Sequence, residues 1–511
     1  MFSIIVGLVI MASTIFYYFC VRPMNYWKRK GVHQGYPSWL FGDILRNILG
    51  LECFLITVYD GYMNAANKRY FGMYMFAKPL LVIKDPALVM EITVKAFDNF
   101  ADHHDIIPTE ADPLWAKSLV QLKGEDWRFM RPLMSRSFSV SKIKTMYKLM
   151  SDCAKNFVDH FKNRIETSIE LNVLDVTARY TNDVIASVAF GVTVDSMNNP
   201  DNEFFQVAKR TTDLTRFWLN LSAFAALVLP GSIMKIFGLR FFDEDVRKYF
   251  FNVLQDSLRM GKDSGTLRSQ LIESLLEAQS AAKKDGSLRQ LDDDDILAQS
   301  LIFFVGGSET VSKLIGFICY ELAMNKEMQD RLRAEILDVS RENDGEITYD
   351  ATMKMEYMDM IISESLRKWP IMGGIDRICT KSYKIEPVTP DEQPIIIEEG
   401  TQTWIPIWSI HHDPKYFPDP EKFDPERFNE ERKKEMYPYA YNPFGLGPRS
   451  CLGQRFSLLK CKIIIMHIIS NFELEPCQKT KVPLGLLNKA FLVNPEVDII
   501  VNMKKCTPKN N

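Results

Sequence analysis

The stretch Phe444-Gly445-Leu446-Gly447-Pro448-Arg449-Ser450-Cys451-Leu452-Gly453 decides the fold. A loop rich in glycine and proline leads to a single cysteine, and an apolar helical pattern begins directly after it. A thiolate at a helix N-terminus is stabilised by the helix dipole and by backbone N–H groups, which also tune a bond from sulfur to iron. Glycines let the backbone approach a flat macrocycle closely. The stretch therefore predicts Cys451 as an axial iron ligand, against the alternative of a buried free cysteine after a tight turn.

The residues around Cys451 carry a family resemblance. Phe444, Gly447, Arg449 and Gly453 stand at the spacing Phe-x-x-Gly-x-Arg-x-Cys-x-Gly. This pattern resembles the haem-ligand signature of the cytochrome P450 superfamily, and the chain looks like its insect microsomal branch, which is rich in detoxification enzymes. The resemblance covers essentially the whole chain. It implies a mainly α fold with a small β region and haem b as the cofactor, with Cys451 holding the iron.

Paired glycines interrupt an apolar run that is typical of a long helix. Gly306-Gly307-Ser308-Glu309-Thr310 lies inside the apolar run at 296–322. Four aspartates at 292–295 directly precede this run and suit a helix N-terminus. Two glycines in a helix interior cost about 1 kcal/mol each against alanine, so they indicate a purpose. Close helix packing is one interpretation. The resemblance implies another, a local widening that admits dioxygen, with Glu309 and Thr310 as an acid–alcohol pair that delivers protons.

Charged residues elsewhere match further motifs of the resembling family. Trp127 and Arg131, spaced i and i+4, face one side of a helix. The resemblance implies that Trp127, Arg131, Arg377 and Arg449 reach the haem propionates. A core tryptophan beside a solvated arginine is the alternative for the first two.

A carboxylate and a guanidinium also share one helix face. Glu364 and Arg367 stand at i and i+3 and can form an ion pair, which on a surface would contribute little. By resemblance the pair is buried, with Arg427 as its third member, and supports the haem loop.

The N-terminal segment predicts a membrane anchor. Residues 2–21 carry no charge, and about 20 apolar residues in a helix span a bilayer. Arg22, Lys28, Arg29 and Lys30 follow, and basic residues stay on the cytosolic side. A cleaved signal peptide is the alternative, although its charges would precede the apolar run. We therefore expect an anchor at 1–22, a basic linker at 23–40, a haem-thiolate monooxygenase domain at 41–504 and a tail at 505–511.

Other segments give coarser expectations. Residues 71–83 predict a strand pair that turns near Lys78-Pro79, and 380–425 predict short strands between proline-rich turns. Residues 140–285 indicate helices, with no clear strand pattern. Within them, 217–242 is apolar, which fits either a buried helix pair or a loop that dips into the bilayer. The nine cysteines form no disulfide or zinc framework, and the net charge of −3 gives no reason to expect nucleic acid as a partner.

The resemblance implies a monooxygenase in the endoplasmic reticulum membrane, with its catalytic domain facing the cytosol. We expect electrons from an NADPH-dependent reductase, with cytochrome b5 as a second possible donor. The expected reductase contacts are Lys123, Arg128, Arg136, Lys142 and Lys144, with a merely solvated basic face as the alternative for each of them. We expect lipophilic substrates, in a pocket lined from 103–119, 217–224, 301–304, 371–375 and 484–492 with Leu114, Trp218, Phe303, Phe304 and Met372 among its apolar side chains. Xenobiotic metabolism is the first interpretation and an endogenous hormone or fatty acid the second. Two rivals remain. One is a reductase-independent haem-thiolate isomerase or dehydratase, which needs no acid–alcohol pair. The other is a non-enzymatic haem- or ligand-binding protein at the membrane, against which the intact cysteine loop and acid–alcohol pair argue.

Overall fold

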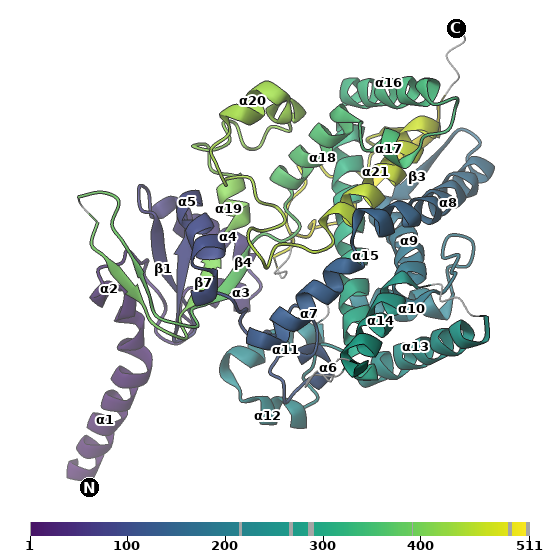
Figure 1. Ribbon diagram of the computed structural model, residues 1–511. Coiled ribbons are helices and arrows are strands. Elements are labelled where there is room, and N and C mark those ends of the chain that lie inside the picture. The colour runs from purple at the N-terminus through teal and green to yellow at the C-terminus, as the bar shows by residue number, and fades with distance from the viewer. Residues whose placement is uncertain are drawn as a thin grey trace.

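A small β region and a larger helical body lie beside each other, and an N-terminal helix projects from the β region (Figure 1). The computed structural model describes residues 2–213, 217–264, 269–284, 291–390, 392–488 and 493–506. The fold is mainly α-helical with small sheets, as the sequence predicts.

The N-terminal helix stands away from the body. It comprises α1 (Phe2–Phe16) and a π-helical stretch (Tyr17–Val21), and its window Ile4–Val21 has a mean hydropathy of 2.3 with no part buried. A 3₁₀ turn (Pro23–Asn25) and α2 (Tyr26–Arg29) follow. In α2, Trp27 is fully buried and donates from Nε1 to the Met73 carbonyl at 3.1 Å. Part of the segment expected as a linker is therefore docked on the β region.

The main sheet has the strand order β1-β2-β7-β4. Its strands are β1 (Tyr70–Met75), β2 (Lys78–Ile83), β4 (Ile375–Ile378) and β7 (Gln402–Ile405), and only β2 and β7 pair in parallel. The predicted strand pair is confirmed, with its turn at Phe76-Ala77, just before the expected position. The strands β5 (Tyr383–Ile385) and β6 (Ile395–Ile397) form a hairpin in the predicted strand-and-turn segment. The short helices of this region are α3 (Leu45–Ile48), α4 (Phe54–Asn64), α5 (Pro86–Met90) and α19 (Ile407–His411).

A second sheet corrects the expectation that residues 140–285 contain no strand. It has the order β3-β9-β8, with β3 (Ser168–Asn172), β8 (Phe472–Glu475) and β9 (Ile500–Lys505). The strand β3 is short and largely exposed, and its partner β9 lies at the other end of the chain. Because tertiary pairing rather than local pattern stabilises such a strand, the local sequence carries little signal for it.

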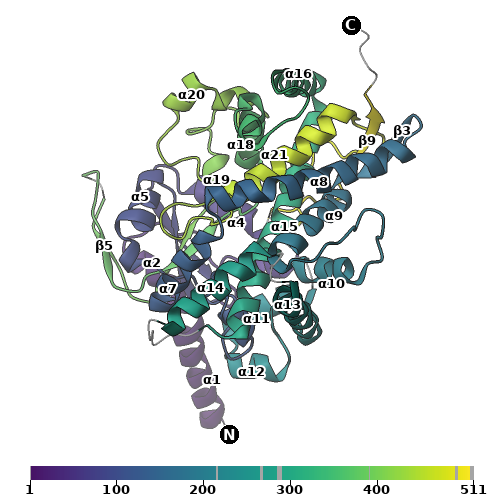
Figure 2. The ribbon, with the colours of Figure 1, turned by 45° about the vertical axis from the view of Figure 1, so that its right-hand side comes forward.

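The helical body is built around one long helix, α15 (Asp293–Met324), which runs through its middle (Figures 1 and 2). The aspartates that open it act as predicted, because Asp292 caps the helix in a reciprocal pair with Asp295. The other helices are α6 (Pro113–Ala116), α7 (Gly124–Arg136), α8 (Val140–Arg164), α9 (Val173–Ile185), α10 (Glu203–Thr212), α11 (Phe217–Val228), α12 (Gly231–Ile236), α13 (Glu244–Ser264), α14 (Gln270–Lys284), α16 (Lys326–Glu342), α17 (Tyr349–Thr352), α18 (Glu356–Lys368), α20 (Glu430–Glu435) and α21 (Gln454–Asn471).

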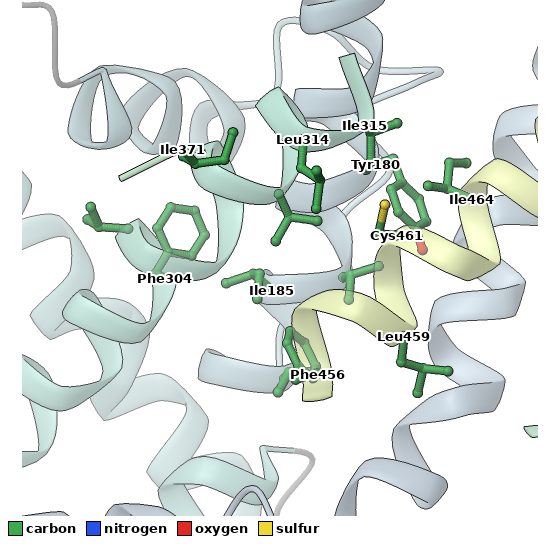
Figure 3. Packing of buried hydrophobic residues seen from close by; sticks show 14 of the residues in the cluster. Tyr180, Ile185, Phe304, Leu314, Ile315, Ile371, Phe456, Leu459, Cys461 and Ile464 are labelled. Atoms are coloured by element: carbon green, nitrogen blue, oxygen red, sulfur yellow. The ribbon is translucent and has the colours of Figure 1, made fainter. Parts of the chain in front are cut away.

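The core of the body forms where α9, α15 and α21 meet. Figure 3 shows Tyr180 of α9, Leu314 and Ile315 of α15, and Cys461 of α21 packed together, and all four are buried. The helix α15 is apolar and long enough to cross a membrane, but 72% of its apolar window is buried inside the protein. It is therefore a core helix, and it fixes the elements that carry the functional residues relative to one another.

Candidate functional site

The loop before α21 places Cys451 beside the N-terminus of that helix. The Cys451 N–H donates to the Phe444 carbonyl at 2.9 Å, which closes the loop, and Gly453 caps α21. Gly445 and Gly447 have φ angles of 72° and 75°, which L side chains rarely adopt. A Cβ at Gly447 would also lie 2.0 Å from the Thr93 carbonyl oxygen. The glycines therefore let the loop fold tightly against the rest of the protein.

Cys451 opens into a cavity of about 220 Å³ between α7, α15 and the loop. The lining residues are His103, Leu119, Val120, Trp127, Arg131, Met134, Phe138, Ile302, Phe303, Gly306, Gly307, Arg449, Ser450, Cys451, Leu452, Gly453, Phe456 and Ser457. Phe138, Phe303 and Phe456 pack against one another, with ring centroids 4.8 to 6.3 Å apart. The structure thus brings Trp127, Arg131, Arg449, Cys451 and Gly453 round one cavity.

Burial raises the pKa of the Cys451 thiol, and three neighbours oppose that effect. The backbone N–H groups of Gly453 and Gln454 and the guanidinium of Arg131 lower this pKa, because each stabilises the thiolate. The side chain is exposed although it lies inside the body, because it faces the cavity. A thiolate directed into a cavity and held by backbone donors is suited to binding a metal from one side.

Three guanidinium groups lie at or near this cavity. Arg131 donates to the Ser450 carbonyl at 2.8 Å, and burial lowers its pKa. Arg377 is almost wholly buried, burial lowers its pKa to about 10, and its Nε has no hydrogen-bond partner among the described residues. Arg377 does not line the cavity, but its Nη1 lies 3.5 Å from Nδ1 of His103, which does. Buried cations with unused donors fit a ligand with carboxylates, so the residues present suit haem.

Arg449 has a larger structural role than the sequence indicates. Its guanidinium donates to the carbonyls of Ala101, Leu119 and Leu122 and to the Asp102 carboxylate, and stacks 4.2 Å from the Trp127 ring centroid. It therefore fastens segment 101–122 to the cysteine loop. No sequence pattern signals these partners, because most of them are backbone carbonyls.

The turn at Gly306–Thr310 faces the cavity through its two glycines. A Cβ at Gly307 would lie 2.7 Å from Ile185 Cδ1 of α9, whereas one at Gly306 would meet nothing within 4 Å. Close packing thus explains Gly307, and Gly306 leaves open space. The helix stays α-helical here, and Thr310 donates from its hydroxyl to the Gly306 carbonyl.

Glu309 forms an ion pair with Lys313, a residue that no motif names. Its carboxylate lies 2.5 Å from Nζ of Lys313, one helical turn further along α15, and Lys313 is buried. The i,i+4 spacing of opposite charges could have revealed this pair. Phe444, Glu309 and Thr310 do not line the cavity, although each belongs to an element that does.

The expected buried ion cluster around Glu364 is confirmed, and its support of the haem loop stays a prediction. Glu364 and Arg367 are fully buried, and their side chains meet at 2.8 and 2.9 Å. Arg427 places Nε 3.4 Å from the Glu364 carboxylate, without hydrogen-bond geometry. The Asp424 N–H donates to the same carboxylate at 2.9 Å. The cluster ties α18 to the segment before α20, and breaking such a buried pair is costly.

Only some of the residues expected to line the substrate pocket lie at the cavity. His103, Leu119 and Phe303 line it, whereas Phe304 packs on Phe190 and Phe250 in the core, and Trp218 is 67% exposed. Residues 489–492 of the expected lining are outside the described residues.

The basic residues expected to dock a reductase are mostly in ion pairs. The pairs are Lys123 with Asp105, Arg128 with Asp98, Lys142 with Glu273 and Lys144 with Asp350. Arg136 is exposed at the end of α7.

The comparisons with known proteins all point to one family, and together they cover nearly the whole chain. A family model described as Cytochrome P450 matches residues 46–503. The chain is 39% identical over 456 residues to cytochrome P450 9e2 of Blattella germanica, with 84% of each chain covered. It is 34% identical over 501 residues to probable cytochrome P450 9f2 of Drosophila melanogaster, with 95% of this chain and 96% of the relative covered. It is 33% identical over 520 aligned positions to cytochrome P450 6k1 of Blattella germanica, with 98% and 97% covered.

Proposed function

The chain belongs to the cytochrome P450 family, and from that premise we propose that it oxidises lipophilic compounds with electrons from an NADPH-dependent reductase. Members of this family are monooxygenases that bind haem b through a cysteine thiolate. The haem, when bound, supplies the chemistry that activates dioxygen and inserts one of its oxygen atoms into the substrate. The observation that carries the proposal is the shared cavity, which Cys451 lines together with Gly306, Gly307, Arg131 and Arg449.

Each residue near the cavity has a proposed role. Cys451 would hold the iron, and the Gly453 and Gln454 N–H groups would keep its sulfur anionic. Arg131 and Arg377 would bind the propionates with their unused donors, and Trp127 would pack beside them together with Arg449. Phe444 and Gly453 would shape the loop through the closing hydrogen bond and the helix cap.

Glu309 and Thr310 are the proposed proton-delivery groups. The Thr310 hydroxyl is held on the Gly306 carbonyl, next to the cavity, and can pass a proton on when it turns. Glu309 would supply the proton. Because Lys313 binds its carboxylate, Glu309 must leave that partner, or exchange protons through water, to act.

The proposed substrates are lipophilic foreign compounds. Ile302, Phe303 and the rings packed against Phe303 give the cavity apolar walls that exclude water. The resemblance to the insect microsomal branch supports xenobiotic metabolism, and an endogenous hormone or fatty acid is the alternative substrate. Arg136 and the surrounding basic residues of α7 and α8 would receive the reductase, with cytochrome b5 as a second donor.

The proposed location is the endoplasmic reticulum membrane, with the body in the cytosol. The unburied apolar helix α1 supports an anchor. Ile236, the last residue of α12, and Phe237, directly after it, are 80% and 71% exposed. The helices α1, α11 and α12 lie toward the same lower end of the molecule in both views (Figures 1 and 2). We propose that this end rests on the bilayer, so that residues 217–242 dip into it.

The test is product formation over a panel of lipophilic compounds, with purified full-length protein in lipid. We expect oxidised product only when both NADPH and the reductase are present. Product that forms equally well without them would support the isomerase or dehydratase alternative and overturn the proposal. Turnover restricted to endogenous steroids or fatty acids would overturn the xenobiotic part alone.

A further inference from the structure

Lys460 is a buried lysine on α21, the helix that follows the cysteine loop. Its side chain is fully buried in the core between α8, α9, α15 and α21. Its amine donates to the Gly307 carbonyl of α15 and lies 5.6 Å from the centroid of the Phe456 ring. Among the described residues, this is the one hydrogen bond that the amine makes. A buried ammonium with one acceptor is costly, so an apolar side chain would be expected here on stability alone.

The acceptor of this hydrogen bond lies in the turn that carries the proton-delivery groups. The carbonyls of Gly306 and Gly307 each receive a side-chain donor, the Thr310 hydroxyl for the first and the Lys460 amine for the second. Each carbonyl has two lone pairs, so it can also accept the helical N–H four residues later. Both glycines line the cavity. Because paired glycines loosen a helix, this turn depends on contacts from outside α15.

We propose that Lys460 is a positioning residue for proton delivery: its amine holds the Gly307 carbonyl, and with it the turn that presents Glu309 and Thr310. The inference rests on the proposed function. Hydrogen bonds from a charged donor are roughly twice as strong as neutral ones, so the charged amine holds the turn more firmly than the neutral amine. Lys460 does not line the cavity, and it acts through the backbone of α15.

The protonation of Lys460 should therefore affect coupling near neutral pH. Burial lowers the pKa of this amine to about 7. The ionisable groups that act on it are Cys461 on its own helix and Cys153 on α8. Burial raises the pKa of both thiols, to about 12 for Cys153, so they stay neutral. The Tyr180 hydroxyl of α9 donates to the Lys460 carbonyl, and burial holds its pKa well above its usual value. The amine is thus the group that titrates here.

The experiment compares Lys460→Met and Lys460→Gln with Lys462→Met. Lys462 is a buried lysine of the same helix that instead binds Asp359 at 2.8 Å and the Thr352 carbonyl, so it is a matched control. Product and hydrogen peroxide are measured per NADPH oxidised, with one good substrate. We expect about a tenfold rise in the peroxide-to-product ratio for Lys460→Met, because the variant loses a hydrogen bond from a charged donor. Lys460→Gln keeps a neutral donor and should fall in between, and Lys462→Met should match the wild type.

The pH profile gives a readout that a merely structural role would not move. In the wild type, the peroxide-to-product ratio should rise between about pH 6 and about pH 8 as the amine loses its charge. This rise of the peroxide-to-product ratio with pH should be absent from both Lys460 variants and should persist in Lys462→Met. If Lys460→Met does not fold, the wild-type profile and Lys460→Gln decide the matter. A profile shared by all variants would overturn the inference.

Hydrogen exchange tests whether the Lys460 amine stabilises the turn at Gly307, and it needs neither reductase nor substrate. In the ferric protein, the Val311 amide, which the helix directs to the Gly307 carbonyl, should exchange about tenfold faster in Lys460→Met than in Lys462→Met. Equal exchange would overturn the inference. If the wild type makes no product with NADPH and reductase, the proposed function fails instead. If Thr310→Ala uncouples turnover and Lys460→Met does not, the inference alone fails.

Discussion

At the scale of residues, Cys451 carries the assignment. Cys451 lines the cavity, and its backbone N–H closes the loop by donating to the Phe444 carbonyl. We predict that Cys451→His abolishes the red-shifted Soret band of the reduced, carbon-monoxide-bound protein, since that band reports thiolate ligation. A normal band in the variant would contradict the assignment. Cys477→Ser, which changes a free thiol that does not line the cavity, should keep the band and serves as the control.

Thr310 gives a second prediction at this scale. Thr310→Ala removes the hydroxyl that binds the Gly306 carbonyl, while helix propensity stays high. General acid–base groups contribute roughly 10²–10⁴-fold, and water can replace part of that, so we expect at least about a tenfold rise in the peroxide-to-product ratio. The readout is product and peroxide per NADPH oxidised. Coupling equal to that of the wild type would mean that protons arrive by another route.

Single residues also show how far a sequence can be interpreted. Cys451, Trp127 and Arg131 could be assigned to one site, because a motif names them and the helix period places them together. The partners of Arg449 could not, because they are backbone carbonyls from a distant segment. Lys460 sits in an apolar run, and its acceptor on α15 is far away in sequence, so no local pattern points to it.

At the scale of elements, the contact of α21 with α15 through Lys460 predicts a dependence of stability on pH. The pKa of this amine is about 7 in the folded protein and close to its ordinary, higher value in the unfolded chain. Between about pH 7 and pH 10 the unfolded state therefore binds more protons, and stability rises with pH by at most about 1.4 kcal/mol per pH unit.

The measurement is the difference in Tm between the wild type and Lys460→Met across that range. The Tm of the wild type should rise relative to that of the variant as the pH rises, and the difference in Tm should be constant below pH 7. Other titrating groups are shared by the two proteins and cancel. A difference that does not change between about pH 7 and pH 10 would show that the amine keeps its proton in the core.

The elements differ in how well the sequence specifies them. The start of α15 and the β1–β2 pair follow from local signals, a run of aspartates for the helix and two short apolar runs joined by a turn for the strands. The strand β3 was missed because β9, its partner, is at the far end of the chain. Residues 217–242 form α11 and α12, whose exposed apolar side chains favour the bilayer interpretation over a wholly buried pair.

At the scale of the whole molecule, the docking of Trp27 determines where the anchor can be removed. Gly72 of β1 has no room for a Cβ, which would lie 2.2 Å from the Trp27 indole. We predict that deleting residues 2–22 weakens membrane attachment and leaves the body folded. Deleting residues 2–30 also removes Trp27, and loss of a buried tryptophan costs about 3–5 kcal/mol.

The measurements are membrane flotation and Tm for the two truncated proteins. Trp27→Ala in the full chain is the matched control, because it removes the indole and keeps the anchor. Equal Tm values for both truncated proteins would contradict the docked arrangement. Residual membrane binding after either deletion is expected from the exposed apolar side chains of 217–242. Protease added to sealed microsomes should digest the body, since we place it in the cytosol.

The measurement that most directly tests the central claim uses isotopically labelled dioxygen. The full-length protein, NADPH and reductase are incubated with ¹⁸O₂ and one substrate, and the mass of the product is measured by mass spectrometry. We predict one labelled oxygen atom per product molecule, and no labelled product without NADPH or with Cys451→His. Product that carries no label would contradict the account, because its oxygen would then come from the substrate or from water.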